Sequence, residues 1–219
     1  MLKAVIFDLD GTLLYTLEDL KDSANRALAQ FGYPRKSVEE IRTYVGNGVS
    51  KLISRCLPNG ELNENFNQCL DFFKKDYKEN MYNKTRPYSG IVEMLDILES
   101  KGIKTAVVSN KFDSAVKELC QKYFPNNFSI TLGESKNIRK KPAPDSVLAV
   151  MEQIGAEKNS VIYVGDSEVE IQTAQTAQIP CISVDWGYKD SDFLKEHTAQ
   201  TIVSSVEELT NKILTIWSI

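Results

Sequence analysis

The chain has 219 residues, which is long enough for a core domain and a smaller inserted domain. Hydrophobic residues make up 42% and charged residues 26%, as in ordinary globular proteins. The net charge of -4 argues against a general basic surface, so we expect no nucleic-acid partner. No apolar stretch approaches membrane-spanning length, and Met1 to Lys3 run directly into a core-like strand. We therefore expect no signal peptide and no membrane partner.

The cysteines indicate a reducing compartment. They lie far apart, form no CxxC pair and have no histidine companions, which argues against a zinc site. Reduced thiols in a cytoplasmic protein are the simplest interpretation for Cys56, Cys69, Cys120 and Cys181.

The first predicted element is a buried strand, formed by the apolar run from Ala4 to Phe7. Asp8 and Asp10 follow this run, and Gly11 then turns the chain. Open α/β sheets bind ligands at the carboxyl ends of their strands, where two acids are costly unless a positive charge such as a metal ion neutralises them. The start of the chain therefore indicates a metal and phosphate site.

The segment from residue 15 to 82 carries only helical patterns, with successive apolar stripes at helical spacing. Thr16 with Asp19, and Ser37 with Glu40, are expected to form capping boxes at the first two helices. No strand pattern interrupts this segment. We predict that it is an all-α helical cap inserted after the first strand.

After residue 83 the patterns alternate between strand and helix, which predicts a doubly wound parallel sheet with helices on both faces. The fold class is thus α/β, with a Rossmann-like catalytic core formed by residues 1–14 and 83–219 and the cap formed by residues 15–82. The expected helices cover residues 89–101, 112–123, 144–154, 168–178 and 205–216, and the expected strands cover residues 103–108, 129–132, 160–164 and 181–184.

Polar residues that can hold metal and phosphate recur in order along the chain, each group after a strand or at a helix start. The groups are Asp8 and Asp10; Ser109 and Asn110; Lys141; and Asp166 followed by Glu170. In order and spacing they resemble the four-motif signature of the haloacid-dehalogenase-like superfamily of phosphohydrolases. The resemblance extends from Met1 to about Gly187.

The two acids of the first motif have distinct expected roles. A carboxylate can attack phosphorus and form an aspartyl-phosphate, and the resemblance assigns this role to Asp8. Asp10 is the expected general acid and base. Dehalogenases of the superfamily lack an acid at the second position, so Asp10 points to phosphatase or phosphomutase chemistry. The alternative for Asp8, an acid that only caps the turn, does not explain the other motifs.

The remaining motifs are expected to hold the phosphoryl group. A positive charge at Lys141 would stabilise the reacting centre, and we favour it over Lys140 because the family pattern places the lysine directly before proline. The expected catalytic residues are Asp8, Asp10, Ser109 and Lys141, and the expected substrate-binding residues are Gly11, Thr12, Ser109, Asn110 and Lys141.

The resemblance also implies a metal site. Asp8, the backbone carbonyl of Asp10, and Asp166 form an all-oxygen ligand set that suits Mg²⁺. Glu170 departs from the family, which usually has aspartate at this position. It could support the water shell of the metal, or it could be a solvent-facing acid in the first turn of a helix.

Substrate selectivity is expected in the cap. The stretch from Tyr44 to Gly48 resembles the cap loop of phosphoglycolate phosphatases, as do the segments 86–90 and 109–111. Gly46 and Gly48 can equally mark a plain helix break. Lys51 and Arg55, about one helical turn apart, can simply face solvent. The candidate specificity residues are Gly46, Asn47, Gly48, Lys51 and Arg55.

The sequence thus predicts a Mg²⁺-dependent phosphomonoester hydrolase for a small-molecule phosphoester such as 2-phosphoglycolate. A β-phosphoglucomutase-like enzyme and a pyrophosphatase or nucleotidase are the alternatives on the same scaffold. A phosphate-binding protein without activity is an alternative from another class. The sequence makes no prediction of the oligomeric state.

Overall fold

The computed structural model describes residues 2–216. It contains two compact units: a core unit, Met1–Leu14 with Pro87–Ile219, and a cap unit, Tyr15–Arg86. The predicted second boundary fell four residues earlier, after residue 82. The segment 83–86 stays with the cap unit because the buried Asp19 carboxylate accepts hydrogen bonds from the backbone of Lys84 and Thr85.

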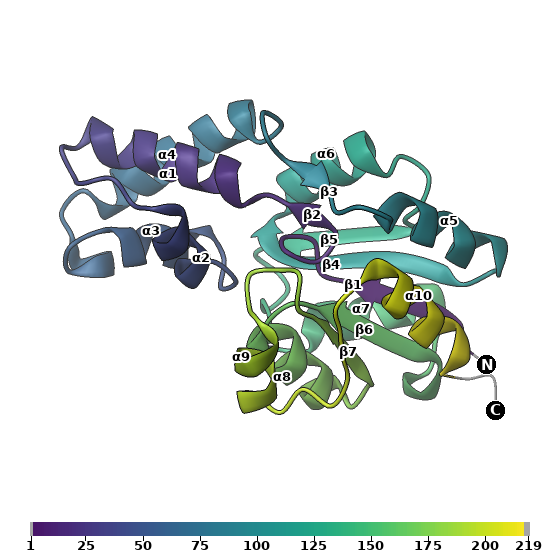
Figure 1. The fold of residues 1–219 in the computed structure, drawn as a ribbon. Coiled ribbons are helices and arrows are strands. Elements are labelled where there is room, and N and C mark those ends of the chain that lie inside the picture. The colour runs from purple at the N-terminus through teal and green to yellow at the C-terminus, as the bar shows by residue number, and fades with distance from the viewer. Residues whose placement is uncertain (1, 217–219) are drawn as a thin grey trace. The chain divides into compact units, whose positions relative to one another are not determined.

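The core unit is built on a six-stranded sheet in the order β5-β4-β1-β6-β7-β8, and each neighbouring pair is parallel (Figure 1). The strands are β1 (Ala4–Phe7), β4 (Lys104–Phe112), β5 (Ile130–Glu134), β6 (Val161–Gly165), β7 (Cys181–Val184) and β8 (Ile202–Val203). Strand β1 lies between β4 and β6, and all four of its residues are fully buried. The predicted α/β fold class is confirmed.

Helices cover both faces of this sheet. Ala4 and Ile6 of β1 pack in one cluster with residues of α7 and α8, such as Val150 and Ala174. Because side chains alternate along a strand, the neighbouring residues Val5 and Phe7 point to the opposite face, and they are buried as well. The core helices are α5 (Ile91–Ser100), α6 (Asp113–Tyr123), α7 (Asp145–Ile154), α8 (Glu168–Ala177), α9 (Ser191–Glu196) and α10 (Val206–Thr215), with a short 3₁₀ helix at Lys158–Ser160.

Predicted and observed elements of the core differ mainly in length. Strand β4 was expected to end at residue 108 but continues to Phe112. It therefore carries Ser109 and Asn110 within the strand rather than after it. Helix α9 and strand β8 were not predicted, because six and two residues are too short for a clear apolar period.

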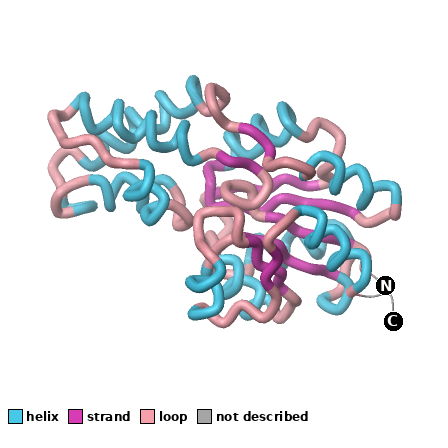
Figure 2. The backbone as a smooth tube through the Cα atoms, viewed as in Figure 1, coloured by secondary structure: helices cyan, strands magenta, loops and turns pink. Residues whose placement is uncertain are grey.

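The cap unit is helical, as predicted, and Figure 2 shows its helices joined by short loops. They are α1 (Leu17–Gln30), α2 (Val38–Tyr44), α3 (Val49–Cys56) and α4 (Phe66–Asn80), with a 3₁₀ turn at Gly60–Leu62. The Ser37–Glu40 capping box is confirmed. The Thr16–Asp19 box is wrong, since Thr16 has φ -112° and ψ -2° and its side chain makes no capping bond.

Two short strands lie where the chain passes between the units. β2 (Leu14–Tyr15) and β3 (Arg86–Pro87) pair with each other, and the pattern of the sequence did not predict them. Among residues 2–216, no helix is long and apolar enough to cross a membrane.

Candidate active site

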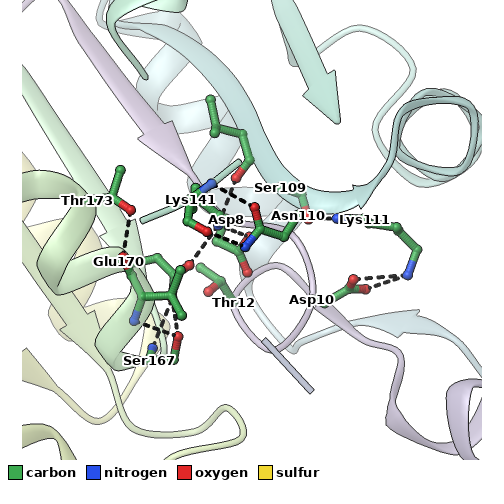
Figure 3. Close-up of polar contacts among 12 residues, drawn as sticks. Asp8, Asp10, Thr12, Ser109, Asn110, Lys111, Lys141, Ser167, Glu170 and Thr173 are labelled. Atoms are coloured by element: carbon green, nitrogen blue, oxygen red, sulfur yellow. Dashed lines mark hydrogen bonds and ion pairs between the residues drawn. The ribbon is translucent and has the colours of Figure 1, made fainter. Parts of the chain in front are cut away.

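The candidate site lies at the carboxyl ends of β1, β4 and β6. Lys141 lies at the centre of this site. The Lys141 Nζ atom lies 2.6 Å from Asp8 Oδ1, 2.7 Å from Glu170 Oε1 and 3.2 Å from the carbonyl oxygen of Val108 (Figure 3). The side chain of Lys141 is only 2% exposed. Its neighbour Lys140 instead lies 3.8 Å from Glu134, with its side chain 39% exposed. The structure therefore places the predicted lysine, Lys141, against the predicted nucleophile.

Three buried acids gather around this lysine. Asp8, Asp166 and Glu170 each offer a carboxylate oxygen within 4.8 Å of the others. Burial raises the pKa of Asp8 to about 7, although Lys141 opposes the shift, and burial raises the pKa of Asp166 well above its usual range. The pKa of Lys141 is also raised well above its usual range, because Asp8 and Glu170 outweigh its own burial.

These residues fit a divalent cation. Three buried carboxylates share one ammonium, so the cluster holds more negative than positive charge when all are ionised. Burial is the main cause of the raised pKa values of Asp8 and Asp166, and the repulsion from Glu170 adds to it. Carboxylate oxygens are the ligands that hard cations prefer.

Asp166 is held by backbone that approaches it closely. The backbone N–H of Tyr188 donates to Oδ2 at 2.7 Å, and the Thr12 hydroxyl lies 3.4 Å from Oδ1. A Cβ atom on Gly187 would lie 2.4 Å from Asp166 Oδ2, and one on Gly11 would lie 2.3 Å from it. Gly11 also has φ +91°, which a residue with a side chain rarely adopts. Both glycines are therefore required by the position of Asp166.

Glu170 is part of the site. It is 3% exposed, and its second oxygen accepts hydrogen bonds from the backbone N–H and the hydroxyl of Ser167 in a capping box at the start of α8. The alternative of a solvent-facing acid is therefore wrong. A Cβ atom on Gly165 would lie 2.0 Å from Glu170 Cγ, so this glycine leaves room for the longer side chain.

Strand β4 supplies the groups of the second motif. The side-chain amide of Asn110 donates to the carbonyl oxygen of Lys141 at 3.0 Å and accepts from its N–H at 2.9 Å. Asn110 thus fixes the backbone of Lys141. Ser109 is buried beside it and accepts a hydrogen bond from the N–H of Lys111 at 3.3 Å.

The structure does not bring the Asp10 carboxylate into the acid cluster. Its two oxygens each lie 3.0 Å from the Nζ atom of Lys111, which is a buried residue. Lys111 lies in the segment 109–111, for which the sequence predicted a resemblance but no role for this lysine. One feature of the sequence indicated a role for Lys111: a lysine directly follows Ser109 and Asn110 at the end of a core strand.

The specificity candidates all lie in the cap unit. Arg55 donates to the carbonyl oxygen of Tyr44 and to Oδ1 of Asn47, both at 2.7 Å. It therefore braces the loop that contains Gly46 and Gly48. Lys51 forms an exposed ion pair with Glu61 at 2.7 Å.

Comparison with known proteins identifies the family of the chain. The haloacid dehalogenase-like hydrolase model matches residues 5–184, so the chain belongs to that family. A phosphoglycolate phosphatase from Thiobacillus denitrificans is 33% identical over 213 residues, which cover 94% of this chain and 93% of that protein. A phosphoglycolate phosphatase from Nitrosospira multiformis is 31% identical, covering 97% and 96% of the two chains.

Solved structures show the same relationship. A protein from Lactobacillus delbrueckii subsp. bulgaricus, provisionally named a phosphoglycolate phosphatase, is 36% identical with a TM-score of 0.92, covering 96% of this chain and 98% of that one. The predicted family is confirmed, and so is its enzyme class, a phosphatase of small phosphorylated metabolites. Phosphatases of this family generally use a divalent metal, in agreement with the acidic cluster.

Proposed function

We propose that the chain is a Mg²⁺-dependent phosphomonoester hydrolase that forms an aspartyl-phosphate on Asp8, with 2-phosphoglycolate as its substrate. The observation that carries this proposal is the buried contact of 2.6 Å between Asp8 and Lys141 within an acidic cluster. An ammonium at this position neutralises both a carboxylate nucleophile and the phosphoryl group that it attacks.

The metal would be held by Asp8, Asp166 and the backbone carbonyl of Asp10. All of these ligands are oxygens, and the side chains of Asp8 and Asp166 offer atoms within 4.8 Å of each other. When bound, Mg²⁺ would neutralise charge on the phosphoryl oxygens and keep the carboxylates ionised. The second effect matters because burial raises the pKa of Asp8 to about 7.

The chain's residues account for both halves of the reaction. An oxygen of Asp8 attacks phosphorus while the bond from phosphorus to the ester oxygen breaks, and Asp10 gives that oxygen its proton. A water molecule then attacks phosphorus, Asp10 takes its proton, and inorganic phosphate leaves Asp8 as a free carboxylate. Lys141 stays charged throughout, since its pKa is raised well above its usual range. Ser109 and the backbone N–H groups beside it would bind phosphoryl oxygens, together with Gly11 and Thr12.

The substrate proposal rests on the relatives named phosphoglycolate phosphatase, at 33% and 31% identity. We place selectivity in the cap loop that contains Gly46, Asn47 and Gly48, braced by Arg55. Lys51 is the further candidate for reading the substrate. The four cysteines are free thiols, which supports a cytoplasmic location.

A substrate panel tests the proposal. The purified chain is assayed in Mg²⁺ with 2-phosphoglycolate, pyrophosphate, a nucleoside monophosphate, and β-glucose 1-phosphate with its bisphosphate activator. We expect the highest kcat/KM for 2-phosphoglycolate, no activity in excess chelator, and no activity for Asp8→Asn. Stronger activity towards another compound would contradict the assignment of 2-phosphoglycolate as the substrate. Full activity in excess chelator would contradict the assignment of a metal ion to the site. Isomerisation of the sugar phosphate without release of phosphate would show that the enzyme is a mutase and not a hydrolase.

A further inference from the structure

The ion pair between Lys111 and Asp10 is the least expected contact in the site. The Nζ atom of Lys111 lies 3.0 Å from each carboxylate oxygen of Asp10. The side chain of Lys111 is 1% exposed and that of Asp10 is 19% exposed. Figure 3 shows Lys111 extending from β4 to Asp10, on the side away from Lys141 and Glu170.

Stability alone gives a weak reason for this pair. Taking an ammonium out of water is costly, and an apolar side chain of similar volume commonly stabilises a fold as well or better. The pair also joins two segments that carry the reaction. Asp10 follows Asp8 by two residues, and Lys111 follows Ser109 by two residues.

The neighbouring residue of β4 acts in a similar way. Asn110 uses both ends of its amide to hold the backbone of Lys141, at 2.9 and 3.0 Å. Two consecutive side chains at the end of β4 therefore contact two residues with proposed roles in catalysis. A general acid must lie within hydrogen-bond reach of the atom it protonates, so the direction of its side chain matters.

We propose that Lys111 is a positioning residue that fixes the direction of the Asp10 carboxylate for proton transfer. This inference rests on the proposed function, since it assumes that Asp10 protonates the leaving oxygen and later activates water. In this role Lys111 contacts the carboxylate of Asp10 and not the reacting atoms. Its effect on catalysis passes through Asp10.

The dependence of the rate on the leaving group tests this role. An alkyl phosphate has a poor leaving group and needs the proton from Asp10, whereas 4-nitrophenyl phosphate has a good one and needs it little. We expect Lys111→Met to lower kcat/KM for an alkyl phosphate about 10- to 100-fold, and for 4-nitrophenyl phosphate no more than about threefold. Lys111→Arg, which keeps the charge, should recover part of the loss. Lys104→Met, an exposed lysine on the same strand, is the matched control and should change neither value.

A double-mutant cycle with Asp10→Asn separates positioning from a general structural role. If Lys111 acts through Asp10, Lys111→Met should lower kcat/KM for the alkyl phosphate less than about twofold in the Asp10→Asn background. Equal losses in both backgrounds, or equal losses with both leaving groups, would overturn the proposal.

Two control measurements separate a wrong role for Lys111 from a wrong proposed function. Wild-type activity in Mg²⁺, and its loss in Asp8→Asn, are measured first. An inactive wild type would overturn the proposed function and the role of Lys111 together. If Lys111→Met fails to melt cooperatively, Lys111→Gln takes its place under the same criteria. Failure of both variants to fold would assign Lys111 to stability and overturn the positioning role.

Discussion

Replacing Asp8 with asparagine should make the metal-free protein gain stability relative to the wild type as the pH rises from 5 to 8. The substitution keeps the shape of the side chain but removes a buried carboxylate. Burial raises the pKa of Asp8 from its ordinary value of 3.8 to about 7, and the repulsion from Glu170 adds to this effect. The cost of ionising Asp8 in the folded chain therefore lowers the free energy of unfolding as the pH rises towards 7.

The sign and size follow from proton linkage. Between pH 3.8 and about 7 the folded chain keeps a proton on Asp8 that the unfolded chain has lost, so stability falls as the pH rises through this window. Each pH unit within the window corresponds to about 1.4 kcal/mol, which gives about 4 kcal/mol in total. Asparagine does not titrate. The variant should thus gain about 2 to 3 kcal/mol over the wild type between pH 5 and pH 8.

Denaturant unfolding of both proteins in excess chelator, at several pH values from 5 to 8, measures this difference. Mass spectrometry must confirm that the asparagine has not deamidated. Saturating Mg²⁺ should narrow the gap, because the cation binds the folded wild type and stabilises it by mass action. A stability difference that does not change with pH, or a variant that becomes relatively less stable as the pH rises, would refute the reasoning.

Three further predictions concern other parts of the structure. Gly187→Ala places a Cβ atom 2.4 Å from Asp166 Oδ2. The Mg²⁺ concentration needed for half-maximal activity should therefore rise about tenfold or more. An unchanged Mg²⁺ titration would show that the backbone at Gly187 can shift freely. Asp19→Ala removes the carboxylate that accepts hydrogen bonds from the buried N–H and hydroxyl of Thr85. In chemical unfolding it should lower the free energy of unfolding by about 2 to 4 kcal/mol. The control Asp71→Ala, at an exposed position, should change it by less than about 0.5 kcal/mol. Ca²⁺ should inhibit the Mg²⁺-dependent reaction in a competition assay, since its looser coordination can occupy both oxygens of the Asp8 carboxylate; equal rates with the two ions would contradict this expectation.

Much of the site could be predicted because it is built from strand ends. The carboxyl ends of adjacent parallel strands meet at one edge of a sheet, so polar residues after β1 and β6 come together whatever lies between them. The apolar run before Asp8 and the run before Asp166 are local signals that a reader of the sequence can see. Lys141 comes from a loop, and its prediction depended on the resemblance to a family.

The contacts that sequence reasoning missed join residues far apart in the chain. Lys111 and Asp10 are separated by 101 positions, and no local pattern identifies which carboxylate a buried lysine will meet. Asp19 has the spacing of a capping residue after Thr16. Thr16 has helical rather than extended backbone angles, so the expected capping box does not form. Asp19 instead binds the backbone 65 residues later. Glu170 likewise contacts Lys141, 29 positions earlier in the chain, and no local pattern shows this contact.

Trapping the phosphorylated enzyme tests the central claim most directly. In Asp10→Asn, 4-nitrophenyl phosphate should still phosphorylate Asp8, since its leaving group needs little protonation, while the following attack by water is slow. Acid quenching and peptide mapping by mass spectrometry should then find one phosphoryl group on Asp8, and none when Asp8→Asn is added. A stoichiometric burst of nitrophenolate with the phosphoryl group on another residue, or on no residue, would contradict the account.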